Sequence, residues 1–182
     1  MRGAEAVVTR GVFLKRQCVV KNRIAKKYRI KEIDSALRTS RTKVEARLLH
    51  RAKMAGVKCP IVLKVDDFSI TMTYINGKRP KMNAGESEEA GKMLGLLHNA
   101  GIIHGDYTPA NILKSGNALF VIDFGLGYFS HHIEDMAVDV YTMLRALDGK
   151  VQKQFLSGYE SYKNHGAVFA RVEQISKRVR YA

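Results

Sequence analysis

The sequence predicts an α+β protein of two lobes, with a β-rich N-lobe and a smaller, helical C-lobe. Short runs rich in β-branched residues, separated by brief polar or glycine-bearing turns, fill the first part of the chain. Stretches of helical periodicity fill the last part. Between them, residues 75–85 are polar and rich in turn-forming residues, which is typical of a linker. We therefore place the N-lobe at residues 1–76 and the C-lobe at residues 77–182.

The N-lobe is expected to combine an antiparallel sheet with one helix. The helix has Val44, Leu48 and Leu49 on one face, and Gly56 follows it as a C-terminal cap. Two later strands form a hairpin around a pair of aspartates. The predicted strands are residues 6–9, 12–14, 18–21, 61–65 and 69–74, and the predicted helix is residues 42–55.

The C-lobe is expected to alternate helices with one functional loop. A helix at residues 86–99 leads into a loop at 102–111, and a short strand follows at 119–122. Three helices complete the chain, at residues 133–147, 152–162 and 167–178. No internal repeat or low-complexity tract interrupts this pattern.

The composition excludes several classes of protein. The chain has 182 residues, of which 46% are hydrophobic and 26% charged, which argues against intrinsic disorder. No apolar run approaches the roughly 18 residues of a membrane span, and the N-terminus lacks a signal-peptide pattern. Cys18 and Cys59 match no metal or redox motif. We expect a soluble cytoplasmic protein that does not bind membranes.

The chemistry is concentrated in two motifs separated by one apolar strand. The first, residues 104–111, has the form H-x-D-x-x-x-x-N, and the second is Asp123-Phe124-Gly125. A loop carboxylate can orient a hydroxyl or water nucleophile, while an amide and a second carboxylate bind Mg²⁺ and the nucleotide phosphates. We therefore assign Asp106 as base or orienting group, and Asn111 and Asp123 as Mg²⁺ ligands. The motif pair indicates a kinase-like site.

Two upstream residues match the rest of such a site. Lys21 ends an apolar strand, where a kinase-like fold carries the lysine that neutralises the ATP phosphates. Glu45 lies on the following helix, where the ion-pair partner of that lysine is expected. The alternative for Glu45 is a capping box with Thr42, in which it satisfies the start of the helix. Together with Asp106, Asn111 and Asp123, the ion pair is the favoured interpretation.

The hairpin that leads into the linker is expected to hold the adenine of ATP. Met72 would border the base, and the Thr73 carbonyl and Ile75 N–H would bond to it. A G-x-G-x-x-G loop is absent, and only 57 residues follow Gly125, too few for a peptide-binding subdomain. The predicted fold is therefore protein-kinase-like, with a minimal, truncated helical C-lobe.

The positive charge is concentrated in the first lobe. Residues 1–76 contain 18 Lys and Arg against 6 Asp and Glu, whereas residues 77–182 contain 13 against 11. A one-sided field of this kind attracts polyanions such as nucleic acids. The alternative is a solvated face that only maintains solubility.

These motifs resemble a known family, the small atypical Ser/Thr protein kinase subunit of the KEOPS complex. The resemblance covers nearly the whole chain and is most specific in the R-T-x-x-E-A-R-L-L block and in the H-G-D-x-T-x-x-N loop followed by D-F-G-L. The end of the chain departs from the usual R-G-R tail, with Val179 between two arginines. The segments that carry the resemblance are residues 3–6, 19–29, 41–60, 101–113, 122–141 and 177–182.

The resemblance implies an ATP- and Mg²⁺-dependent enzyme that phosphorylates Ser or Thr in isolation and acts as an ATPase within its complex. It implies a function in threonylcarbamoyladenosine modification of tRNA, beside the tRNA threonylcarbamoyltransferase subunit. It also implies a small subunit that caps the N-lobe. The basic N-lobe and the tail with Arg178 and Arg180 would contact tRNA.

Two other functions remain as alternatives. A catalytically weak pseudokinase scaffold would bind tRNA and partner subunits without turnover. A small-molecule kinase of the aminoglycoside or choline type uses a similar H-G-D loop, but it needs a large helical insert to hold its substrate. The short segment after Gly125 argues against that second alternative.

Overall fold

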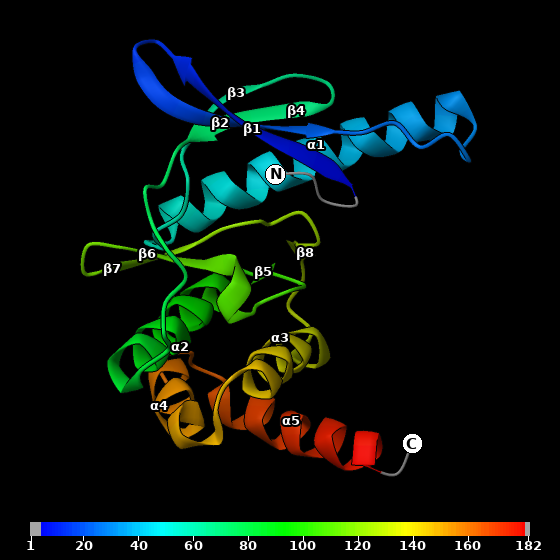
Figure 1. Cartoon of the computed structure of the whole chain (residues 1–182). Helices are drawn as coiled ribbons and strands as arrows, with labels where there is room; N and C mark the ends of the chain where they lie inside the picture. The colour runs from blue at the N-terminus through cyan, green and yellow to red at the C-terminus, as the bar shows by residue number, and fades with distance from the viewer. Residues whose placement is uncertain (1–4, 181–182) are drawn as a thin grey trace.

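The computed structural model describes residues 5–180, with an N-lobe sheet above helix α1 and a helical C-lobe below it (Figure 1). Gly3 and Ala4, from the first segment that carries the family resemblance, lie outside the described residues, as does the side chain of Arg180. No helix of the described residues is long and apolar enough to cross a membrane. The division at residue 76 stays a prediction.

Among residues 5–180, the N-lobe sheet has four strands in the order β1-β2-β4-β3, and each neighbouring pair is antiparallel. The prediction of two short strands at residues 6–9 and 12–14 was wrong, because they form one continuous strand. Every residue of that strand pairs with β2, and the turn falls at Leu14 and Lys15, whose φ angles of 48° and 62° suit a tight hairpin. The strands are β1 (Ala6–Phe13), β2 (Arg16–Arg23), β3 (Val62–Val65) and β4 (Ser69–Thr73).

Helix α1 (Lys31–Met54) begins eleven residues before its predicted start. The charged first part stays helical, with an ion pair of 2.7 Å between Asp34 and Arg38, one turn apart. The Thr42 hydroxyl donates to the Arg38 carbonyl inside the helix, at 2.7 Å, so Thr42 does not cap its start. The predicted end is confirmed, since Gly56 follows the helix with φ of 87°.

The described part of the C-lobe contains four α-helices, and the predicted positions of all four are close to the observed ones. Strand β6 was missed because its second half, Lys114 and Ser115, is polar. It pairs with β7 in a hairpin, and this hairpin separates the two motifs of the site. The elements are α2 (Ala84–Asn99), β5 (Ile102–Ile103), a 3₁₀ turn (Pro109–Asn111), β6 (Ile112–Ser115), β7 (Ala118–Val121), β8 (Tyr128–Phe129), α3 (Ile133–Ala146), α4 (Gly149–Tyr159) and α5 (His165–Arg180).

Helices α2 and α4 pack backbone against backbone. A Cβ atom added at Gly91 of α2 would overlap the Phe155 carbonyl of α4, and one at Gly158 would overlap the Glu88 carbonyl of α2. The functional loop is anchored to this helix pair, because the buried Tyr107 hydroxyl donates to the Ala90 carbonyl at 2.8 Å. The C-lobe core therefore fixes the loop that carries Asp106.

Candidate active site

The side chain of Lys21 joins the two lobes. It extends from β2, and its Nζ lies 2.6 Å from Oε1 of Glu45 on α1 and 2.7 Å from Oδ1 of Asp123. Glu45 sits in the middle of α1 with only 2% of its side chain exposed. The capping-box interpretation of Thr42 and Glu45 is thereby excluded, because the helix starts at Lys31.

Asp123 follows β7 in a left-handed backbone conformation, with φ of 62°. Its Oδ1 also accepts the Gly125 N–H, at 3.2 Å. Desolvation would raise the pKa of this carboxyl, but the charge and hydrogen bond of Lys21 and the Gly125 N–H lower it below its ordinary value. Asp123 is therefore an anion at neutral pH, as a metal ligand must be.

Asp106 and Asn111 are held against each other by the loop and the short 3₁₀ turn. The Asn111 amide donates from Nδ2 to the Asp106 carboxylate at 2.8 Å and to the Asp106 carbonyl at 2.9 Å. Because its NH₂ group is used in this way, the amide oxygen of Asn111 is turned away from Asp106. The Ile122 N–H donates to the Asn111 carbonyl, which ties this loop to the segment before Asp123.

His104 connects the loop to the second motif. Its ring is buried, and burial lowers the pKa of the imidazole despite the opposing effect of Asp139. We assign the neutral tautomer with the proton on Nε2, which donates to the Ile122 carbonyl at 3.1 Å, while Nδ1 accepts the Asp106 N–H at 3.3 Å. The ring therefore sets the direction of the Asp106 backbone.

Asp139 of α3 supports the loop that carries Asp106, and none of the sequence motifs predicted it. Its carboxylate accepts the backbone N–H groups of His104 at 2.6 Å and Gly105 at 2.9 Å. It also lies 3.4 Å from Nε2 of His98, whose Nδ1 lies 2.6 Å from the Tyr159 hydroxyl. A sequence signal existed: this acid interrupts the apolar face of α3 formed by Met136, Val140 and Met143.

The three residues predicted to contact adenine lie at the end of β4 and just after it. Met72 is buried and pairs with Val19 of β2. Thr73 turns its hydroxyl toward the Ile61 N–H, at 2.9 Å, and Ile75 is half-buried in the segment that follows. Their contact with adenine stays a prediction.

The oxygen atoms of Asn111 and Asp123 fit a magnesium ion. Mg²⁺ prefers hard oxygen ligands and usually takes one or two protein groups, completing its shell with phosphates and water. The Asn111 amide oxygen and the half-exposed Asp123 carboxylate provide such a set. Within residues 5–180, no cluster of three or more His, Cys, Asp or Glu forms a separate metal centre.

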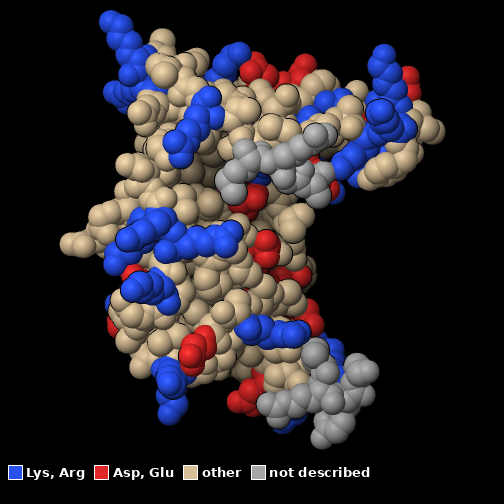
Figure 2. Space-filling view, viewed as in Figure 1, with Lys and Arg blue, Asp and Glu red and all other residues tan. Residues whose placement is uncertain are grey.

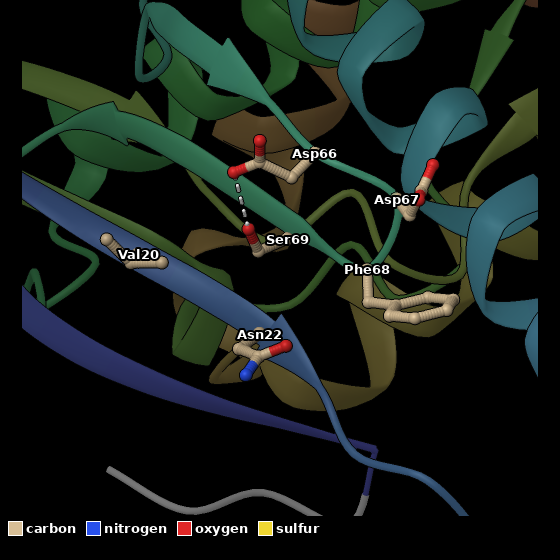
Figure 3. A pocket seen from close by; sticks show the side chains of 6 residues that line it. All are labelled: Val20, Asn22, Asp66, Asp67, Phe68 and Ser69. Carbon is tan, nitrogen blue, oxygen red and sulfur yellow. Dashed lines mark hydrogen bonds between the residues drawn. The ribbon is translucent and has the colours of Figure 1, made fainter.

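Two cavities have linings that include none of these residues. One, of about 360 Å³, is lined by Val20 and Asn22 of β2 and by the β3–β4 turn with Asp66 and Asp67 (Figure 3). Because side chains alternate along a strand, Val20 and Asn22 lie on the face of β2 opposite to Lys21. This cavity is thus separated from the ion pairs by the sheet itself.

The chain is similar to a known protein family and to archaeal relatives. The model of the RIO domain family matches residues 8–137. A probable serine/threonine-protein kinase BUD32 homolog of Archaeoglobus fulgidus is 42% identical over 171 residues, covering 90% of this chain and 88% of the relative. A probable bifunctional tRNA threonylcarbamoyladenosine biosynthesis protein of Methanosarcina mazei is 41% identical over 99% of this chain, which spans 35% of that longer protein.

Solved structures show the same fold. The Rio2 kinase of Chaetomium thermophilum, in its ADP/Mg²⁺-phosphoaspartate complex, superposes with a TM-score of 0.70 over 96% of this chain and 64% of its own. The two sequences are only 17% identical, so this similarity is evidence for the kinase-like fold alone. The family match and the archaeal relatives carry the assignment further: this chain belongs to the RIO domain family and is homologous to the archaeal BUD32 proteins.

Proposed function

We propose that this chain is an atypical Ser/Thr kinase and ATPase of the KEOPS type, which uses ATP and Mg²⁺ and supports threonylcarbamoyladenosine modification of tRNA. The observation that carries the proposal is the position of Lys21, whose ammonium lies between Glu45 and Asp123 at 2.6 and 2.7 Å. One relative is named as a probable serine/threonine-protein kinase and another as a tRNA threonylcarbamoyladenosine biosynthesis protein, which supports the proposed reaction and pathway.

In this proposal each side chain has a separate task. Lys21 neutralises the phosphates of ATP, and Glu45 holds Lys21 in place from the buried side. Asn111 and Asp123 hold Mg²⁺, which supplies charge neutralisation at the phosphates when it is bound. Asp106 orients the attacking hydroxyl or water and accepts its proton, with its own position set by Asn111 and His104.

The partners are proposed from the relatives and from charge. In the bifunctional relatives, a segment similar to this chain is joined to further sequence within one polypeptide, which supports function beside a tRNA threonylcarbamoyltransferase subunit. A small subunit would cap the N-lobe. Figure 2 shows Lys and Arg side chains over the N-lobe and around the level where the lobes meet. These cations and the exposed Arg178 are the proposed tRNA contacts, together with Arg180.

The substitution Asp123→Ala tests the enzymatic part of this proposal. We expect it to abolish Mg²⁺-dependent ATP hydrolysis while thermal unfolding shows an intact fold. Asp67→Ala is the matched control, because Asp67 is an exposed aspartate in the β3–β4 turn, away from Lys21. Turnover is measured with and without the transferase subunit and tRNA. Undiminished hydrolysis in Asp123→Ala would contradict the proposal.

The same assay separates the alternatives. A pseudokinase scaffold predicts that the wild-type chain binds tRNA and partner subunits without hydrolysing ATP. A small-molecule kinase predicts that aminoglycosides or choline accelerate ATP consumption, and that tRNA and the transferase subunit do not. Stimulation by the partner subunit or tRNA favours the KEOPS-type function over both.

A further inference from the structure

The ion-pair cluster around Glu45 contains a second cation, Arg23. It follows Lys21 by two positions on β2, so both side chains leave the same face of the strand. Nη2 of Arg23 donates to Oε2 of Glu45 at 2.5 Å, while Lys21 bonds to Oε1 at 2.6 Å. Arg23 is 5% exposed and Glu45 2%. Each oxygen of this buried carboxylate is therefore held by its own cation.

Arg23 also lies next to the turn that carries Asp123. A Cβ atom added at Gly125 would come within 3.0 Å of the Lys21 ammonium and 3.8 Å of Nη2 of Arg23. On its other side, Nη1 of Arg23 lies 3.7 Å from Oε2 of Glu5. Arg41 forms an ion pair with the same Glu5 carboxylate. Arg23 is thus fixed between the N-terminal segment and the site.

The charges show what Arg23 contributes. In this structure Lys21 contacts two carboxylates, Glu45 and Asp123, so one ammonium is shared by two anions. The Lys21 ammonium has three N–H donors, of which these two carboxylates use two, so a phosphate oxygen takes the third or replaces Asp123. If Lys21 were the only cation at Glu45, its charge would be cancelled by a buried anion, and the pair would attract phosphate weakly.

We propose that Arg23 is a positioning residue of the nucleotide site: it neutralises Glu45, so that the charge of Lys21 is available to the phosphates of ATP. The inference rests on the proposed function, since it needs ATP at this site. Arg23 acts through Glu45 and Lys21 and need not touch the nucleotide.

Binding of Mg²⁺·ATP to the full chain tests this assignment. Arg23→Gln removes one charge-assisted hydrogen bond from a buried carboxylate, and we expect Kd for ATP to rise about tenfold or more. Arg23→Lys keeps the charge and should recover most of the affinity. Arg16→Gln is the matched control, an exposed arginine on the same strand, and should leave Kd unchanged. If Arg23 only stabilises the fold, Arg23→Gln lowers the folded fraction but leaves the Kd of the folded molecules for ATP unchanged. That result would overturn the inference.

A second background keeps the test usable if Arg23→Gln alone does not fold. The double variant Arg23→Gln/Glu45→Gln contains no unpaired buried charge. If Arg23 acts by neutralising Glu45, then adding Arg23→Gln to Glu45→Gln changes Kd less than about twofold. A further tenfold loss in that background would show that Arg23 acts independently of Glu45 and would overturn the inference.

The outcomes also distinguish this inference from the function on which it rests. If the wild-type chain binds ATP and Asp123→Ala abolishes turnover, but Arg23→Gln behaves like Arg16→Gln, only the assignment of Arg23 fails. If the wild-type chain binds no Mg²⁺·ATP, the proposed function fails and the assignment fails with it.

Discussion

The carboxylate of Asp139 accepts the backbone N–H of His104 at 2.6 Å, although the two residues are 35 positions apart in the chain. The bond joins the middle of helix α3 to the start of the loop that carries Asp106. Because Asp139 is 1% exposed and lies in the C-lobe core, it gives the loop a rigid reference point. The position of Asp106 therefore depends on Asp139, which is not proposed to contact ATP or the phosphate acceptor.

Replacing Asp139 with Asn should loosen this loop. The amide can accept one of the two backbone N–H groups but presents its own NH₂ to the other, which leaves a buried donor unsatisfied at a cost of roughly 1–3 kcal/mol. We expect a lower Tm and an ATP turnover reduced by at least about tenfold. Asp135→Asn, a half-buried aspartate on the same helix, is the control and should change turnover little. Equal turnover in both variants would argue against a positioning function of Asp139.

The contact between α2 and α4 predicts a strong effect of a single methyl group. Gly91→Ala places its Cβ on the Phe155 carbonyl, so the two helices must separate and lose packing throughout the C-lobe. We expect a loss of more than about 3 kcal/mol in the free energy of unfolding, measured by urea denaturation.

Gly149→Ala provides the control for this packing prediction. Gly149 begins α4, and a Cβ atom there meets nothing within 4 Å. Alanine favours the helical conformation over glycine, so this variant should be as stable as the wild type or slightly more so. Similar destabilisation in both variants would mean that helix separation is not the cause.

The charge of Glu86 predicts a pH-dependent contribution to stability. This buried residue closes a capping box with Asn83 at the start of α2 and pairs with Lys114 at 2.8 Å. Its hydrogen bond to Lys114 lowers the pKa of Glu86 below the ordinary 4.5, and the backbone N–H of Asn83 adds to this, while burial opposes it. The contribution is therefore present above pH 4.5 and is lost as the pH falls through the lowered pKa.

Glu86→Gln should show this dependence directly. We expect the variant to be less stable than the wild type by roughly 1–2 kcal/mol at pH 7, with the difference shrinking as the pH falls below 4.5. Urea unfolding at several pH values measures it. Glu88→Gln on the same helix is the control, because the exposed pair of Glu88 and Lys92 contributes little. A difference that stays constant from pH 7 to 3 would contradict the assigned charge effect.

The basic N-lobe predicts salt-dependent binding of tRNA. Lys31 is exposed at the first position of α1, and Lys27 is exposed in the turn before it, so the double reversal to Glu should weaken binding. It should also reduce the slope of log affinity against log salt by about 0.7–0.9 for each phosphate that the variant no longer binds. Lys150→Glu/Lys153→Glu on α4 is the control with the same charge change. An unchanged slope in the N-lobe variant would assign these lysines to solvation or to a protein partner.

The elements were predicted best where periodicity was strong and local. The hairpin of β3 and β4 and the four C-lobe helices were predicted close to their observed bounds, because their patterns are complete within each segment. The predicted start of α1, at Thr42, was wrong because Thr42 and Glu45 match the sequence pattern of a capping box. The preceding turns contain more charged than apolar residues and therefore give little periodic signal.

The sequence by itself determined the kinase-like chemistry, since Asp106, Asn111 and Asp123 lie in motifs whose spacing is local. Only the tertiary structure decided what holds that chemistry in place. Glu45 is an ion-pair partner and not a cap because α1 packs against the sheet that contains β2, which brings Lys21 and Arg23 to the two oxygens of Glu45. Asp139 acts on the loop because α3 packs beneath it. Both relationships join residues more than twenty positions apart, and a one-dimensional pattern carries no signal for the burial and distance that create them.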